Sequence, residues 1–176
     1  TSINDGDATA TELAYGIAID ETDHAYVSGS TTWIGEGGTD AFIAKFTPAG
    51  LLNWTKIYGS AANEYASSIC RVQKASVESM LVSIVNTADK STTFMELDTD
   101  GAVIEQYTFA NLIVNRVRGD TANINEGQFV FAGNDGETTP VAKFGMGKVE
   151  DVSSMIKWVK TYESNSSFND IRNSGT

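Results

Sequence analysis

The chain has 176 residues, a mass of 18.8 kDa, 12 Lys and Arg, and 23 Asp and Glu, so its formal net charge is −11. An apolar content of 41% is typical of a globular protein of one domain and excludes a disordered chain. The negative charge argues against nucleic acid and anionic membranes as partners. The longest apolar stretch, residues 80–85, is too short for a membrane helix, so we expect no membrane insertion.

The sequence predicts short β-strands along the chain. Short segments rich in Val, Ile, Phe, Tyr and Thr favour strands. In chain order these segments are residues 15–19, 25–29, 42–46, 52–58, 68–72, 80–83, 94–97, 103–109, 114–117, 129–133, 141–144 and 156–162. Turns with standard turn residues are expected at 47–50 and 98–101. Residues 149–156 are the best helical candidate, although no stretch shows a sustained helical period.

The predicted strands recur in groups of four. In each group the second strand ends in a small residue, at Gly29, Ser83 and Gly133, as expected where strands crowd near a common axis. A period of about 50 residues is typical of propeller blades. We therefore predict an all-β protein, a β-propeller with about three four-stranded antiparallel blades plus the start of a fourth. The blades are expected at residues 12–62, 63–110 and 111–163, with the next beginning at 164–176.

Four segments of the first unit closely resemble the SBBP repeat, at residues 15–20, 25–31, 38–50 and 54–60. The second unit departs from that pattern at Ile84 and near Glu105, and the third returns to it at residues 132–133, 142–144 and Trp158. The resemblance implies a seven-bladed β-propeller in a large secreted or surface protein, with no shared catalytic motif. A fold by itself leaves the activity open.

The chain provides about 3.5 blades, whereas propellers typically close with about 4–8. An open arc would expose apolar faces and strand edges. We therefore expect residues 1–176 to form a single partial propeller domain. Its partners would be other blades of the same longer chain or other protein subunits.

Few residues are candidates for catalysis. His24 is the only histidine, and nothing in the sequence points to the nucleophile and acid that a triad requires. We interpret His24 as a solvated turn residue and Cys70, the only cysteine, as a small core residue. One His and one Cys in different units also argue against a zinc site. We predict no catalytic residue, no metal ligand and no enzyme activity.

Two loops have a composition found in ligand sites. Residues 98–101 resemble the first part of a calcium loop, but the third carboxylate and the closing Glu are missing, and a type I turn explains them equally well. Residues 35–38 are rich in glycine but precede a strand, which argues against a phosphate cradle. We expect no cofactor, with calcium at the acidic turns as the open alternative.

Lysines recur inside predicted strands. Lys45 and Lys143 each precede a Phe in a similar stretch, which places them at one repeat position. A charged residue inside a strand needs a partner when it is buried. Asp40, just before the first of these strands, is the candidate partner of Lys45.

Aromatic side chains mark the last strand of each unit. For Trp54 and Trp158, packing between neighbouring sheets is the first interpretation, and stacking against a glycan is the alternative. Asn53 and Asn165 begin N-glycosylation sequons, and Asn165 falls in a loop between units.

The leading functional hypothesis is a non-catalytic structural or interaction segment of an extracellular or cell-surface protein, serving assembly or adhesion. Three alternatives stay open. They are a glycan-binding propeller, an intracellular or ciliary scaffold, and part of a propeller enzyme whose site lies in other blades.

Overall fold

The computed structural model describes residues 9–119, 127–136, 141–148 and 156–163. Every regular element in those ranges is a β-strand, so the all-β class is confirmed. The strands are β1 (Glu12–Ile19), β2 (Ala25–Thr31), β3 (Asp40–Phe46), β4 (Leu52–Tyr58), β5 (Glu64–Lys74), β6 (Val77–Asn86), β7 (Ser91–Leu97), β8 (Val103–Ala110), β9 (Ile113–Gly119), β10 (Gln128–Asn134), β11 (Val141–Lys148) and β12 (Ile156–Glu163).

The strands form three sheets of four, and in each sheet consecutive strands pair antiparallel. The orders are β1-β2-β3-β4, β5-β6-β7-β8 and β9-β10-β11-β12. Each predicted strand segment lies in one of these strands, so the grouping into fours is confirmed. The helical candidate 149–156 lies outside the described residues except for Ile156, which begins β12.

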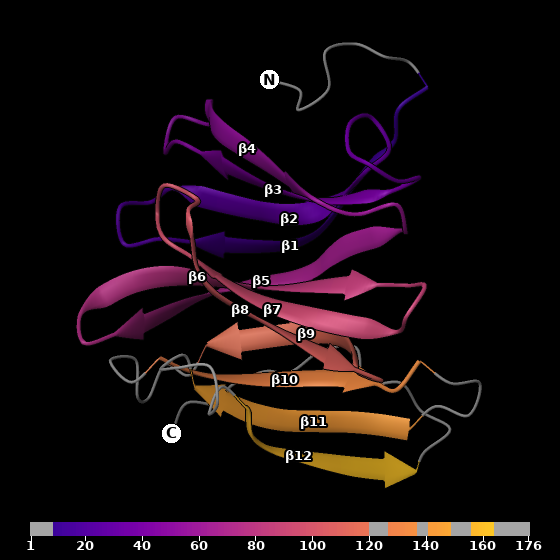
Figure 1. The fold of residues 1–176 in the computed structure, drawn as a ribbon. Coiled ribbons are helices and arrows are strands. Elements are labelled where there is room, and N and C mark those ends of the chain that lie inside the picture. Colours follow the sequence, from indigo (N-terminus) through magenta and orange to yellow (C-terminus); the bar gives the residue numbers. More distant parts are fainter. Residues whose placement is uncertain (1–8, 120–126, 137–140, 149–155, 164–176) are drawn as a thin grey trace.

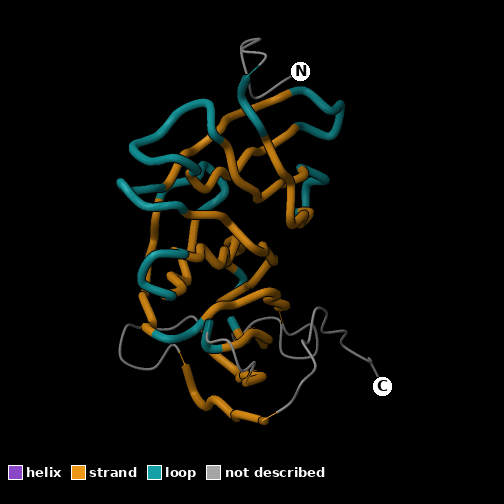
Figure 2. The backbone as a smooth tube through the Cα atoms, turned by 90° about the vertical axis from the view of Figure 1, so that its right-hand side faces the viewer, coloured by secondary structure: helices purple, strands orange, loops and turns teal. Residues whose placement is uncertain are grey.

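The three sheets stack face to face in chain order (Figure 1), and the view turned by 90° shows the same succession (Figure 2). Two apolar cores fill the spaces between them. The core between the first and second sheets includes Tyr26, Ile43 and Leu97. The core between the second and third sheets is centred on Phe94, whose ring contacts Phe129 and Phe131. One sheet alone could not bury both of its faces, so stacking supplies the hydrophobic stabilisation.

A β-bulge interrupts the first strand of every sheet at an equivalent place. The extra residue is Tyr15 in β1, Ser67 in β5 and Asn115 in β9. Opposite the bulge stand Gly29 in β2 and Gly133 in β10. A bulge bends its strand and sharpens the local twist, so the three first strands share one irregular shape.

Close contact with the bulged strand explains the two glycines Gly29 and Gly133, whereas Ile84 takes the equivalent place in β6. A Cβ atom on Gly29 would lie 2.0 Å from the carbonyl oxygen of Leu13, and one on Gly133 would lie 2.0 Å from that of Ile113. The crowding therefore comes from the backbone of the adjacent first strand in the same sheet. These contacts lie within one sheet, and crowding around a common axis stays a prediction.

A second bulge recurs in the fourth strands, at Asn53 in β4, Ile104 in β8 and Lys157 in β12. The strand register makes Phe42, Thr93 and Lys143 equivalent, because they pair with Gly29, Ile84 and Gly133. Lys143 therefore does not share a repeat position with Lys45, and that prediction is wrong.

Candidate functional site

The turn between β1 and β2 is built around the carboxylate of Asp20, which is only 4% exposed. Its Oδ1 atom accepts hydrogen bonds from the backbone N–H of Thr22 and of His24, both at 2.9 Å. The Thr22 hydroxyl donates to the same oxygen at 2.8 Å. This is the local bonding that makes aspartate favourable in turns.

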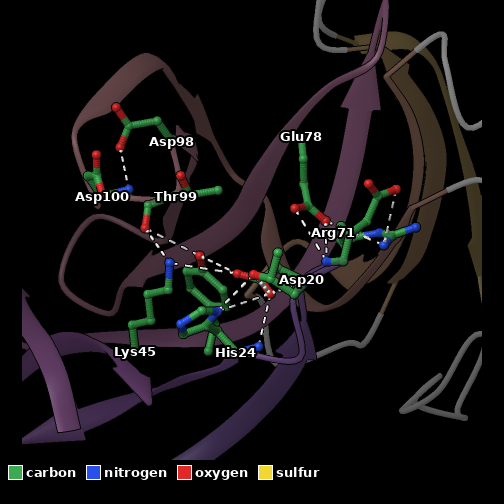
Figure 3. Close-up of polar contacts among 11 residues, drawn as sticks. Asp20, His24, Lys45, Arg71, Glu78, Asp98, Thr99 and Asp100 are labelled. Carbon is green, nitrogen blue, oxygen red and sulfur yellow. Dashed lines mark hydrogen bonds and ion pairs between the residues drawn. The ribbon is translucent and has the colours of Figure 1, made fainter. Parts of the chain in front are cut away.

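The other carboxylate oxygen of Asp20 faces Lys45 (Figure 3). Lys45 Nζ lies 3.6 Å from Asp20 Oδ2 and donates a 2.8 Å hydrogen bond to the carbonyl oxygen of Thr99, in the turn between β7 and β8. The Tyr26 hydroxyl lies 3.1 Å from Asp20 Oδ2 and 3.3 Å from the Thr99 carbonyl oxygen. We call Asp20, Tyr26, Lys45 and Thr99 the inter-sheet junction.

The junction is held in one protonation state at neutral pH. Burial by itself would raise the pKa of Asp20, but the hydrogen bonds from His24, Thr22 and Tyr26 lower that pKa to about 2. Burial and the nearby Asp20 charge raise the pKa of Tyr26. Asp20 is therefore charged and Tyr26 protonated, so neither has the pKa of a general acid or base at neutral pH. The arrangement suits an ion pair within the first sheet, which the hydrogen bonds of Lys45 and Tyr26 to the Thr99 carbonyl oxygen connect to the second sheet.

The partner of Lys45 differs from the one predicted. Asp40 was expected, but Lys45 pairs with Asp20, which belongs to the same sheet and lies far from it in sequence. Asp40 is 2% exposed, and its Oδ1 accepts a 3.3 Å hydrogen bond from the backbone N–H of Glu36 in the glycine-rich loop. Asp40 therefore orders that loop.

A second polar cluster joins the same two sheets near the β5–β6 hairpin. Arg71 Nη1 lies 3.3 Å from Glu78 Oε1 and 3.7 Å from Glu21 Oε1. Glu78 Oε1 also accepts a 3.1 Å hydrogen bond from the backbone N–H of Glu21. Burial raises the pKa of Glu78, and Arg71 and the Glu21 backbone oppose that rise. The cluster positions the hairpin against the first sheet.

The structure differs from the prediction for His24 and agrees with the prediction for Cys70. His24 Nδ1 lies 2.8 Å from Thr22 Oγ1 and 3.4 Å from Asp20 Oδ1, so its ring is a bound part of the turn and not simply solvated. Cys70 is buried in the core between the second and third sheets, as predicted. Burial raises the pKa of its thiol to about 12.

The acidic turn at residues 98–101 has turn hydrogen bonding. Asp98 Oδ1 accepts from the backbone N–H of Asp100 at 2.9 Å and of Ala102 at 2.8 Å. Gly101 has φ 78°, where a side chain would be strained. Across the part of the chain that the structure describes, no group of three or more His, Cys, Asp or Glu side chains comes together to hold a metal ion.

The predicted aromatic and glycosylation positions lie in β4 and in the C-terminal segment. Trp54 is half-buried, and its ring meets Tyr26 edge-to-face with centroids 5.9 Å apart. It packs against the core between the first two sheets, which fits the packing interpretation. Asn53 is exposed at the β4 bulge. Asn165 and the side chain of Trp158 lie outside the described residues.

Hollows on the described part of the surface include one groove and a pair of smaller pockets. A groove of about 480 Å³ separates the outer part of the first sheet from the second, and its lining combines Tyr58 with hydroxyl, amide and carboxylate groups. The polar lining includes Ser60, Glu64, Asn86, Asp89, Thr93, Gln106 and Thr108. Two hollows of about 330 Å³ each lie over the first strands β1, β5 and β9 and share Tyr15 and Arg116.

Sequence reasoning missed the roles of Tyr26 and Arg116. Tyr26 could have been suspected because it is a large polar residue in a predicted inner strand, where burial calls for a hydrogen-bond partner. Arg116 gives no local signal, since its contacts are carbonyl groups far away in sequence.

No protein-family model matches the chain, and no curated protein matches it either. Nothing in the described ranges is a helix of the length and apolarity that crossing a membrane requires.

Proposed function

We propose that this chain is a non-catalytic structural and interaction segment of a β-propeller, within a larger extracellular or cell-surface protein that serves assembly or adhesion. The proposal rests on one apolar position of the first strand in each sheet. This position is buried in the second and third sheets and exposed in the first sheet. Ile17, Ile69 and Val117 stand two residues after the bulge of their first strands. They are 66%, 4% and 1% exposed, respectively.

The buried members of this set point to a stacking rule. Ile69 lies in the core that the second sheet shares with the first, and Val117 lies in the core that the third shares with the second. Each therefore packs on the sheet that precedes it. By the same rule Ile17 would pack on a sheet that precedes the first one.

The neighbours of Ile17 extend this apolar face. Ile19 on the same strand is 57% exposed, and Val27, which pairs with Ile17, is half-buried. The residues equivalent to Val27 are Val82 and Phe131, and both are fully buried. A face of this kind favours a further four-stranded sheet of the same repeat, supplied by the longer chain, as its cover.

The ionisable groups support a non-catalytic role. Asp20 is engaged with Tyr26 and with Lys45, and the thiol of Cys70 is buried and protonated at neutral pH. A reactive cysteine requires a lowered pKa and access to solvent. The excess of carboxylates over cations would suit a soluble surface that repels nucleic acid.

Replacement of Ile17 by Glu in the native polypeptide tests the proposal. If another sheet covers Ile17, the charge must be buried, and the free energy of unfolding should fall by about 2–4 kcal/mol. Val103, an exposed residue of β8, provides the matched control, and Val103→Glu should change it by less than about 0.5 kcal/mol. Equal small effects of the two substitutions would contradict the propeller arrangement. Self-association of the polypeptide that Ile17→Glu abolishes would assign the covering sheet to a second copy.

A glycan-binding role is the second candidate, favoured by the 480 Å³ groove with its Tyr58 wall and polar lining. Carboxylate and amide groups can bond to sugar hydroxyls while an aromatic ring takes the apolar face. A glycan array tests it, with Gln106→Ala and Asp89→Ala as variants. Binding that survives both substitutions, or an array without a hit, would count against this role.

A further inference from the structure

The two hollows over the first strands carry positive charge, whereas the protein as a whole is strongly negative. One is lined by Ala14, Tyr15, Tyr65, Ser67, Asn115 and Arg116. Arg116 is the single charged residue among these, in a chain with 23 carboxylates and a net charge of −11. The adjoining hollow shares Tyr15 and Arg116 and adds Arg118, and none of its described lining residues is a carboxylate.

Arg116 is held in place by neutral groups. Its Nη1 atom donates a 3.0 Å hydrogen bond to the carbonyl oxygen of Tyr15 and a 3.4 Å bond to that of Ser67. Both carbonyls belong to bulge residues, so one guanidinium from the third sheet reaches the bulges of the first and second sheets.

The positive charge of Arg116 is not compensated within the described ranges. No described carboxylate lies within ion-pair distance of its guanidinium, whereas Arg71 pairs with two. The two carbonyls engage Nη1, so the other guanidinium donors keep their capacity for a ligand. A fixed arginine with spare donors is suited to a planar oxyanion, which it can bind through two parallel hydrogen bonds.

Aromatic rings form the wall beside this charge. Tyr15 and Tyr65 meet edge-to-face with centroids 5.6 Å apart, and both line the hollow. Tyr15 is 39% exposed, so its ring is accessible. A volume of about 330 Å³ lies in the range of small-ligand pockets.

We propose that this hollow binds a small monocarboxylate with a flat apolar body, its carboxylate on Arg116 and its body against Tyr15 and Tyr65. One positive charge balances one negative charge. A phosphate dianion would leave a surplus negative charge in the field of an acidic protein, and is therefore disfavoured. The site does not depend on a further sheet beside the first one, so it stands or falls separately from the proposed function.

Titration of the ¹⁵N-labelled polypeptide with sodium benzoate tests the proposal by NMR. We expect saturable shifts of the backbone amides of Tyr15, Tyr65 and Asn115. Benzamide has the same ring without the charge and should give no saturable shift at the same concentrations. Inorganic phosphate should bind more weakly than benzoate. Phosphate that binds more tightly, a benzamide titration equal to that of benzoate, or the absence of saturable shifts would overturn the proposal.

Variants then test Arg116 directly. Arg116→Gln should raise the benzoate Kd by about tenfold or more, because it removes the charge-assisted hydrogen bonds. Arg71→Gln removes an arginine that already has carboxylate partners, and should leave the Kd within about twofold. Equal benzoate affinity of wild type and Arg116→Gln would refute the site. If Arg116→Gln does not fold, Arg116→Lys keeps the charge while losing the planar fork, and it must still bind benzoate in preference to benzamide.

Discussion

Lys45 Nζ lies 2.8 Å from the carbonyl oxygen of Thr99, and this hydrogen bond fastens the first sheet to a turn of the second. The same ammonium lies 3.6 Å from Asp20 and 5.0 Å from the centroid of the Tyr26 ring. Its side chain is 8% exposed, so these protein groups replace much of its hydration. Satisfied bonding of this kind is what makes a buried lysine tolerable.

Lys45→Met should therefore destabilise the protein although methionine fits an apolar strand. The substitution leaves the Thr99 carbonyl without its cation and Asp20 without its nearest positive charge. We expect a loss of about 2–4 kcal/mol in the free energy of unfolding, measured by urea denaturation. Lys56 is exposed on β4, and Lys56→Met serves as the control, with an expected change below about 0.5 kcal/mol. Similar values for the two variants would show that the junction contributes little.

The low pKa of Asp20 predicts a specific acid response. Its pKa falls from 3.8 to about 2 on folding, so its charged form stabilises the folded state above pH 3.8, and that contribution is lost as the pH falls toward 2. A shift of this size corresponds to about 2 kcal/mol. The stability difference between wild type and Asp20→Asn should therefore shrink by about 2 kcal/mol between pH 5 and pH 2.

Urea denaturation across that pH range measures the difference. Asp100→Asn, in the exposed part of the neighbouring turn, is the comparison variant. A stability difference between wild type and Asp20→Asn that is the same at both ends of the range would contradict the assignment to Asp20.

Gly29 and Gly50 provide a test of the bulge. Gly29→Ala would place Cβ 2.0 Å from the Leu13 carbonyl oxygen, so the first two strands must separate. Gly50→Ala meets nothing within 4 Å and suffers only from its φ of 77°. We expect thermal or urea denaturation to show a loss of about 1 kcal/mol for Gly50→Ala and a clearly larger loss, about 2–3 kcal/mol, for Gly29→Ala. The reverse order would contradict the tight pairing at the bulge.

Cys70 should be unreactive while the protein is folded. Burial raises the pKa of its thiol to about 12, so the thiolate that reacts with alkylating reagents is scarce at pH 8. Labelling with a thiol reagent should be slow in buffer and complete in denaturant, with one thiol per chain. Its rate in buffer should follow the rate or extent of unfolding across variants. Rapid labelling of the stable native protein would place Cys70 outside the core.

Much of the fold could be predicted because its signals are local. β-Branched and aromatic residues define the strands, and turn residues such as Gly50 and Gly101 separate them. The segment 52–58 matches β4 at both ends. Where boundaries differ, the structure extends the strand, as in β5, which continues to Lys74 through pairing with Val77. The pairing partner of a strand decides where that strand ends, and the composition of the strand alone does not predict this end.

The polar contacts were harder to predict because they depend on register and stacking. Asp40 is close to Lys45 in sequence, but adjacent turns and strands bring Asp20 to the lysine instead. Lys143 resembles Lys45 by its neighbours, yet its pairing with Gly133 makes it equivalent to Phe42. The contacts of Arg116 require three sheets to be in place at once.

The bulges also decide how the molecule can meet other chains. In each sheet the first and fourth strands are the edges, and both contain an extra residue, such as Tyr15 in β1 and Asn53 in β4. A continuous row of main-chain donors and acceptors, which an incoming strand would need, is broken at every one of these edges. Lateral growth into fibrils is thereby discouraged, while the broad face carrying Ile17 stays open to contact. Association of this protein should therefore proceed by layering and not by strand addition.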